Sequence, residues 1–134
     1  MRKLFIPNDT SAVAMGSNLV ANRFEELIKN KSLDIQVIRN GSRGMFWLEP
    51  LVEFESDSKR FGFQSVDLSE VESILEFICD DSFDAAFNKH PKFLGETENI
   101  EYFKKQQRLS FFRSGLGDPL CIDNYSSLEA FTGL

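Results

Sequence analysis

The chain begins with a strand–helix–strand pattern, which constrains the fold more than any other feature of the sequence. The run "KLFIP", Lys3–Pro7, is short, apolar and closed by proline, as expected of a first strand. Over residues 11–30, apolar side chains recur at helical spacing, after residues of the types that favour helix N-termini. The run "LDIQVIRN", Leu33–Asn40, alternates apolar and polar residues and predicts a second strand. A unit this short favours two parallel strands joined by a crossover helix.

The next forty residues predict an antiparallel hairpin followed by a helix. The runs "PLVEFES" and "RFGFQSV" have the composition of strands, and the polar "SDSKR" separates them at a hairpin-like distance. A helix is expected over 68–79, because Asp67 and Glu70 have the spacing of a capping box. The order β-α-β, then β-β-α, is that of the thioredoxin-like fold. We therefore expect an α/β domain over residues 1–80, with a four-stranded mixed sheet and flanking helices.

The sequence changes character after this domain, and residues 81–134 show no clean period. One strand is expected at Leu109–Arg113 and one turn at Gly115–Pro119. We predict an irregular, extended C-terminal segment. Its scattered phenylalanines need an apolar surface to pack against, which on a free fragment indicates a missing partner.

Composition excludes several classes of function. The net charge is −6, with 21 acidic against 15 basic residues, which disfavours a nucleic-acid surface. No apolar run approaches the ~20 residues of a membrane span, and the apolar part of the N-terminus is too short for a secretion signal. Cys79 and Cys121 are far apart in the sequence, so free thiols are favoured over a disulfide, with Cys79 expected in the core. We expect a cytoplasmic protein that meets other proteins.

A glycine-rich turn, "NGSRG", precedes the third predicted strand. Such turns often hold a metal centre, yet this one contains no cysteine and no histidine. It also lacks the spacing of a phosphate-binding loop. Arg39 and Arg43 favour a solvated or interface role, with binding of an anion or an acidic partner as the alternative. The sequence around His90 shows no catalytic arrangement, so neither a metal site nor a catalytic residue is assigned.

Two long runs carry a resemblance to a known family. They are "RNGSRGMFWLEPLVE", Arg39–Glu53, and "YFKKQQRLSFFRSGLGDPLCIDNY", Tyr102–Tyr125. Both resemble the N-terminal part of the β (diaphorase-type) subunit of soluble, NAD-dependent formate dehydrogenase, which contains molybdenum or tungsten. The second run is also similar to the segment that precedes the flavin domain in subunits of NADH dehydrogenase and NAD-linked hydrogenases. Its Q-R-x-x-x-R-x-x-G-x-x-D-P pattern corresponds here to Gln107, Arg108, Arg113, Asp118 and Pro119, with a one-residue shift in the loop.

The first ~80 residues also resemble thioredoxin-like [2Fe–2S] ferredoxins, whose cluster is held by two cysteine pairs in the loops after the first two strands. The resemblance implies that Pro7, Ala12, Ser42 and Phe46 stand at the former ligand positions, where all four thiolates are absent. Iron–sulfur clusters need thiolates or, more rarely, histidines. We therefore expect a ferredoxin-like scaffold that has lost its metal.

At the same loop, Arg43, Phe46 and Trp47 are expected to form a partner interface, since interfaces favour such residues. The alternative is that Phe46 and Trp47 are simply core.

The resemblance implies an assembly role for this chain and chemistry for its parent subunit. In the family, formate is oxidised at a molybdopterin centre in the α subunit, and electrons pass through iron–sulfur clusters to FMN, which reduces NAD⁺. We expect FMN, NAD and a [4Fe–4S] cluster in the complete β subunit and no cofactor in this chain, which alone is not expected to be catalytic. The expected partners are a cluster-bearing γ-type subunit and the molybdopterin α subunit. The alternative is a free-standing thioredoxin-like or ferredoxin-like redox or metal-binding protein.

Overall fold

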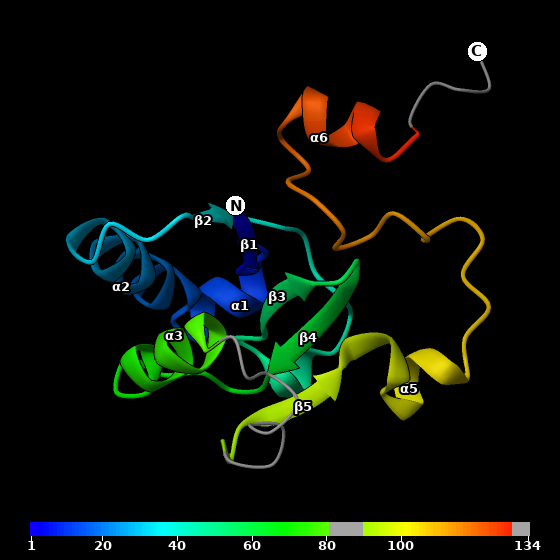
Figure 1. Ribbon diagram of the computed structural model, residues 1–134. Helices are drawn as coiled ribbons and strands as arrows, with labels where there is room; N and C mark the ends of the chain where they lie inside the picture. The colour runs from blue at the N-terminus through cyan, green and yellow to red at the C-terminus, as the bar shows by residue number, and fades with distance from the viewer. Residues whose placement is uncertain (81–89, 130–134) are drawn as a thin grey trace.

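A single mixed sheet organises the chain in the computed structural model, which describes residues 1–80 and 90–129 (Figure 1). The strand order across this sheet is β2-β1-β3-β4-β5. The elements, in chain order, are β1 Arg2–Phe5, α1 Thr10–Ala14, α2 Ser17–Asn30, β2 Ile35–Ile38, the 3₁₀ helix η1 Phe46–Leu48, β3 Val52–Ser56, β4 Lys59–Phe63, α3 Val71–Cys79, β5 Phe93–Glu96, the 3₁₀ helix η2 Thr97–Asn99, α5 Glu101–Lys104 and α6 Ile122–Ser127.

The strand directions follow from the connections. β1 and β2 are parallel and in register from Arg2 opposite Ile35, which confirms the predicted crossover unit. β3 and β4 form the predicted antiparallel hairpin, and β3 also pairs antiparallel with β1. The mixed α/β fold is therefore confirmed, but the sheet has five strands where the sequence predicted four.

The fifth strand comes from the segment that was predicted to be irregular. β5 pairs antiparallel with β4, with Gly62 opposite Gly95. The strand predicted at Leu109–Arg113 is wrong, because those residues form consecutive turns. Leu109 and Phe111 are about three-quarters exposed there, so the apolar run does not mark a buried strand. The division of the chain at residue 80 stays a prediction, although β5 joins the sheet of the first eighty residues.

The long helix predicted over residues 11–30 is interrupted. Gly16 has φ of 98°, a left-handed conformation that glycine adopts without a steric cost, and it separates α1 from α2. The Asp9 carboxylate caps α1 by accepting from the Ser11 and Ala12 amides at 3.1 and 3.4 Å. The first helical turn is therefore held directly after β1, at the end of the sheet where the predicted site lies.

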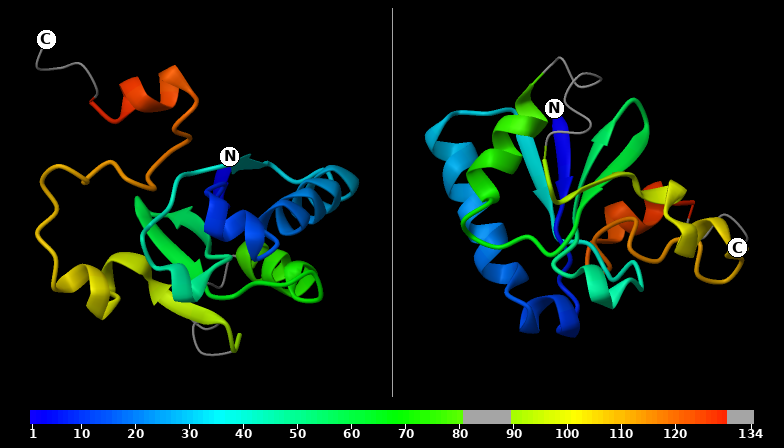
Figure 2. Two further views of the ribbon diagram at one scale, coloured as in Figure 1. Left: turned by 180° about the vertical axis from the view of Figure 1, so that it is seen from behind. Right: turned by 90° about the horizontal axis from the view of Figure 1, so that it is seen from below.

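One face of the sheet is covered by α2 and α3, which pack against each other (Figure 2). Their apolar faces and the inward side chains of β1, β3 and β4 form the main core. Its largest fully buried members are Phe24, Phe54, Phe63, Leu4, Ile6, Ile74, Leu75 and Ile78. Cys79 was expected in this core, but it is exposed, since Ile78 occupies the inward position at the end of α3.

The capping box predicted before α3 is half formed. The Glu70 carboxylate accepts from the Asp67 amide at 3.2 Å, while the Asp67 carboxylate accepts from the Ser69 amide at 2.8 Å. The helix itself begins at Val71, three residues later than predicted.

The second face of the sheet is covered by short elements and loops. A small cluster of Met45, Leu48, Leu51 and Phe103 joins η1 to α5 beside this face. Beyond α5, the chain loops away from the sheet and comes back beside the β3–β4 hairpin before it reaches α6 (Figure 1). No helix among residues 1–80 and 90–129 is long and apolar enough to cross a membrane.

Candidate functional site

The loops after β1 and β2 lie side by side at one end of the sheet. The backbone N–H of Asn8 donates to the backbone carbonyl of Asn40 at 2.9 Å. Arg39 fastens the two loops, since its guanidinium donates to the Ile6 and Pro7 carbonyls at 3.2 and 3.1 Å. It also donates to the Asn18 side chain on α2 at 2.8 Å. The two loops that the resemblance assigned to a cluster site are therefore adjacent and firmly connected.

The four positions predicted as former ligand positions differ in their surroundings. Pro7 and Ala12 are buried, and Ser42 lies in a turn, where its hydroxyl accepts from the Gly44 amide at 2.9 Å. Phe46 is 58% exposed. Three of these side chains have no atom that can bind iron, and the Ser42 hydroxyl already has a backbone partner. The residues present therefore do not fit an iron–sulfur cluster, although their assignment as former ligand positions stays a prediction.

Other metal donors are also not gathered in the described residues. No group of three or more histidine, cysteine, aspartate or glutamate side chains that could hold a metal ion occurs in residues 1–80 and 90–129. Cys79 lies at the end of α3 and Cys121 precedes α6, outside the two loops.

Two aromatic side chains project from η1 beside these loops. Phe46 and Trp47 are 58% and 61% exposed, so neither belongs to the core of this chain. The Trp47 ring packs edge-on against Tyr102 of α5, with ring centroids 5.2 Å apart. Its position is therefore fixed although most of its surface is free. The predicted partner interface stays a prediction for both residues.

Arg43, the third residue predicted for that interface, differs from the other two in its exposure. Its side chain is buried, with its Nε 3.5 Å from the Glu53 carboxylate and its Nη2 in an ion pair with Glu98. Arg60 approaches Glu53 to 3.7 Å from the other side, and Arg108 donates to Glu98 at 2.7 Å. Arg43 therefore belongs to an internal network of three arginines and two glutamates rather than to an exposed surface.

This network holds the returning chain on the second face of the sheet. We call residues 114–117 the strap. Arg60 donates to the carbonyls of Gly115, at 3.0 Å, and of Leu116. The side-chain amide of Asn40 donates to the same Gly115 carbonyl at 2.9 Å. The Gly41 amide donates to the Gly117 carbonyl at 3.3 Å, so the glycine-rich turn and the strap are directly bonded.

The strap requires glycine at one position. Gly115 has φ of 74°, and a Cβ there would lie 2.5 Å from Cδ of Arg43 and 2.8 Å from the Ser42 carbonyl oxygen. Both the backbone conformation and the close approach exclude a side chain. Position 115 therefore requires glycine in this fold.

A buried carboxyl group lies between the two loops and β3. Glu49 is almost fully buried, and burial raises its pKa to about 7, helped by the negative charges of Asp9 and Glu53. Only one of its oxygens has a partner among the described residues, the Leu51 amide at 2.9 Å. Glu49 therefore changes its charge near neutral pH.

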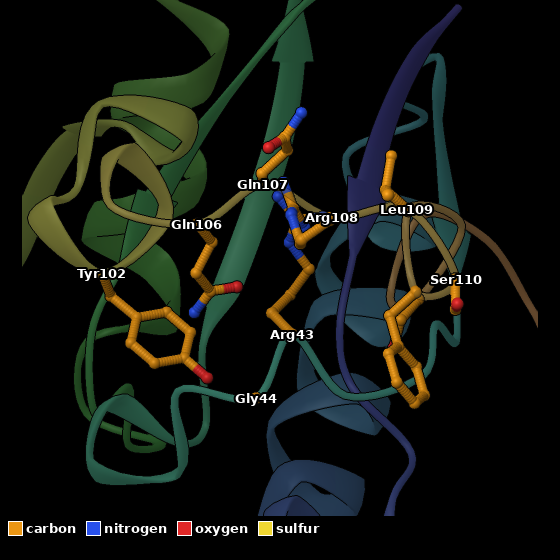
Figure 3. A pocket seen from close by; sticks show the side chains of 10 residues that line it. Arg43, Gly44, Tyr102, Gln106, Gln107, Arg108, Leu109 and Ser110 are labelled. Carbon is orange, nitrogen blue, oxygen red and sulfur yellow. The ribbon is translucent and has the colours of Figure 1, made fainter.

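A cavity of about 540 Å³ opens between the glycine-rich turn and the chain after α5 (Figure 3). Arg43 and Arg108, which both pair with Glu98, line it, and so does the Tyr102 ring. Gln106, Gln107, Ser110 and Ser114 also line it. No described residue that lines this cavity is acidic, which is unusual in a chain with six excess negative charges.

His90 has neighbours that resemble a catalytic pair but are oriented differently. Its Nε2 lies 3.2 Å from the Ser73 hydroxyl, while its Nδ1 accepts from the Lys92 amide at 3.2 Å. Nε2 therefore carries the proton and donates to Ser73, whose own hydroxyl donates to the Glu70 carbonyl at 2.9 Å. Burial lowers the pKa of His90, which keeps the ring neutral. The ring is not placed to take a proton from Ser73.

Sequence reasoning missed Glu49, Glu53 and the cavity. The run "MFWLEPLVEF" did contain a signal, because it places two glutamates four residues apart among apolar residues. Burial of both was therefore indicated by their neighbours. The ion-pair partners of Glu53 are Arg43 and Arg60, and no local pattern identifies them.

The fold resembles solved structures of a ferredoxin. A structure of the thioredoxin-like [2Fe-2S] ferredoxin from Aquifex aeolicus matches with a TM-score of 0.55 at 13% identity, covering 72% of this chain and 93% of the ferredoxin. The wild-type structure at 1.5 Å resolution matches with a TM-score of 0.50 at 18% identity, covering 57% and 82%. A cysteine-to-serine variant gives 0.55 at 16%, covering 71% and 99%. These matches show that the chain has a thioredoxin-like fold.

The match covers most of the ferredoxin, so the likeness extends over nearly the whole of that smaller protein. At identities this low it establishes the fold alone. No model of a protein family matches the sequence, and neither does the sequence of any curated protein.

Proposed function

We propose that this chain is the N-terminal docking module of the electron-transferring β subunit of an NAD-dependent formate dehydrogenase. The parent enzyme converts formate and NAD⁺ to CO₂ and NADH through iron–sulfur clusters and FMN. The module itself carries no redox centre, and it serves to hold the β subunit against a cluster-bearing γ-type subunit or the molybdopterin α subunit.

One observation carries the proposal. The fold is that of the ferredoxins and has two adjacent loops at one end of the sheet, yet three of the four predicted former ligand positions, Pro7, Ala12 and Phe46, have no side-chain atom that can bind iron. The exposed Phe46 and Trp47 project beside these loops. Exposed aromatic residues on a fixed backbone are typical of the centre of a protein interface. The strap supports the proposal as well, because it holds the chain that leads to α6 at a fixed place on the sheet.

Co-purification with the cluster-bearing γ-type subunit tests the docking role. Removing both aromatic side chains, by Phe46→Ala with Trp47→Ala, is expected to weaken binding by about a hundredfold, since interface aromatics each contribute on the order of 1–2 kcal/mol. The control is Leu120→Ala, which removes an even more exposed apolar side chain before α6. Equal binding of the double variant and the native chain would contradict the docking role at this surface.

Colour and metal content distinguish the docking role from the alternative, a free-standing ferredoxin-like redox protein. After reconstitution with iron and sulfide, we expect the purified chain to stay colourless and to hold no stoichiometric iron. Absorbance between ~400 and 600 nm that survives dialysis would favour the ferredoxin alternative, because that band arises from thiolate–iron charge transfer.

A further inference from the structure

We propose that the cavity between the glycine-rich turn and residues 102–114 binds a phosphate group, either free or carried by a small organic molecule. This inference does not depend on the proposed function, because it concerns a site that the described residues of this chain form alone. Its volume of about 540 Å³ lies within the usual range for small-molecule sites, which is roughly 300–1,000 Å³.

The charge of the cavity favours an anion. Arg43 and Arg108 both line it, and no acidic side chain does among the described residues. Outside this lining, the half-exposed Glu98 pairs with both arginines, and the buried Glu53 is shared by Arg43 and Arg60. Arg43 and Arg108 thus bring two positive charges to a lining that is otherwise uncharged, and an anion in the cavity would be attracted by both.

The geometry of Arg108 leaves it able to bind. Its side chain is 22% exposed, and its guanidinium stacks 4.3 Å from the centroid of the buried Phe103 ring. One of its N–H groups donates to Glu98, while a guanidinium carries five. The stacking fixes the plane of the group, so the remaining N–H groups are presented without a large loss of side-chain entropy.

The buried Arg43 guanidinium adds to the positive potential in the cavity. Its Nη1 is buried without a hydrogen-bond partner among the described residues, and such a donor is costly to leave unsatisfied. The group stays in place because Phe103 packs against it, with the guanidinium carbon 4.7 Å from the ring centroid. The positive charge at the floor of the cavity is therefore preformed.

The neutral side chains around the two arginines favour phosphate over a carboxylate. Gln106, Gln107 and Ser110 are exposed at the cavity and carry N–H or O–H donors, as Figure 3 shows for their positions. A phosphate monoester has three terminal oxygens and free phosphate has four, and they accept from several directions, whereas a carboxylate has two. The volume also exceeds that of a phosphate ion, which leaves space for an organic group against Tyr102 and Phe111.

Calorimetric titration of the whole chain with inorganic phosphate and with adenosine monophosphate tests the proposal. Saturable binding of either is expected, and the affinity should fall as salt is added, because the contact is partly exposed. Tighter binding of the nucleotide would identify an esterified phosphate as the ligand, and tighter binding of inorganic phosphate a free one. Adenosine without phosphate is the control, and it is expected not to bind.

Two variants locate the site. Arg108→Gln should weaken binding by about tenfold or more, since hydrogen bonds to charged groups contribute roughly 1.5–3 kcal/mol. Its control, Arg23→Gln, makes the same charge change on α2 at the other face of the sheet. Ser110→Asp places a negative charge in the cavity at an exposed position that does not disturb the core, and should also weaken binding by at least tenfold. Its control is Asn22→Asp on α2.

Two results would overturn the proposal. One is the absence of binding of both probes up to about 10 mM, which is weaker than the affinity of ordinary small-molecule sites. The other is binding that Arg108→Gln and Ser110→Asp leave as tight as in the native chain, while circular dichroism shows both variants folded.

Discussion

The two faces of the sheet are built from alternating residues of the same strands, yet their chemistry differs. On β3, Val52 and Phe54 point into the apolar core beneath α2 and α3, whereas Glu53 points to the other face and is equally buried. The helical face is filled by hydrocarbon and aromatic rings. The second face holds charges paired across segments that are far apart in the sequence.

This difference separates two tasks. Apolar burial is non-directional and stabilises the fold as a whole. Ion pairs and hydrogen bonds depend on direction, so the second face specifies where the strap lies. Because the glutamates there are shared among three arginines, removing one partner would leave a buried charge unpaired. We expect the helical face to determine the stability of the fold and the second face to determine the position of the strap.

The largest expected effect lies on the helical face. Phe54→Ala should lower the free energy of unfolding by about 4 kcal/mol, because it removes a fully buried ring and leaves a cavity. Urea unfolding followed by circular dichroism measures this. The matched control is Phe46→Ala, which removes the same side chain from an exposed position and should change stability by no more than about 0.5 kcal/mol. Comparable losses in the two variants would mean that Phe46 is part of the core.

A smaller but more localised effect is expected on the second face. Gly115→Ala should cost roughly 2–3 kcal/mol, because the new Cβ meets Arg43 and the Ser42 carbonyl in addition to a strained backbone. Gly95→Ala is the control. Its φ of 79° is nearly the same, but no atom lies within 4 Å of its Cβ position, so it should cost only about 1 kcal/mol.

Hydrogen exchange sharpens this comparison of the two glycines. The Gly41 amide donates to the strap at Gly117, so its exchange should accelerate in Gly115→Ala and not in Gly95→Ala. Amides of α2 should stay protected in both variants. Equal exchange of the Gly41 amide in the two variants would show that the strap is not held by the close packing at Gly115.

The difference between the two faces also explains which features could be predicted from the sequence and which could not. The crossover unit, the hairpin and α3 follow from periodicity and turn residues, which are local signals. β5 was missed because "KFLGE" is short, contains a glycine and follows His-Pro, so its strand conformation depends on pairing with β4. Arg43 was expected in a partner interface, because interfaces favour arginine. Its burial depends on Glu53 and Glu98, and only the tertiary structure brings these residues together.

Glu49 tests whether a negative charge lowers the stability of the fold in the loops at the end of the sheet. Its pKa is raised from 4.5 to about 7, so the folded protein binds the proton more tightly than the unfolded chain does. The contribution of this group to stability is therefore complete below about pH 4.5 and is lost as the pH rises through about 7. The shift sets an upper limit of roughly 3 kcal/mol, and we expect about 1–2 kcal/mol, because the protein relaxes around a buried charge.

Glu49→Gln removes this dependence, since the amide is neutral at every pH. Relative to the native chain, the variant should gain about 1–2 kcal/mol between about pH 5 and about pH 8. Urea unfolding at both pH values measures the difference, and Glu25→Gln, which neutralises an exposed carboxylate on α2, is the control. A difference between variant and native chain that stays constant with pH would mean that Glu49 remains ionised in the fold. Buried ionised groups would then occur in the loops at the end of the sheet as well as on the second face.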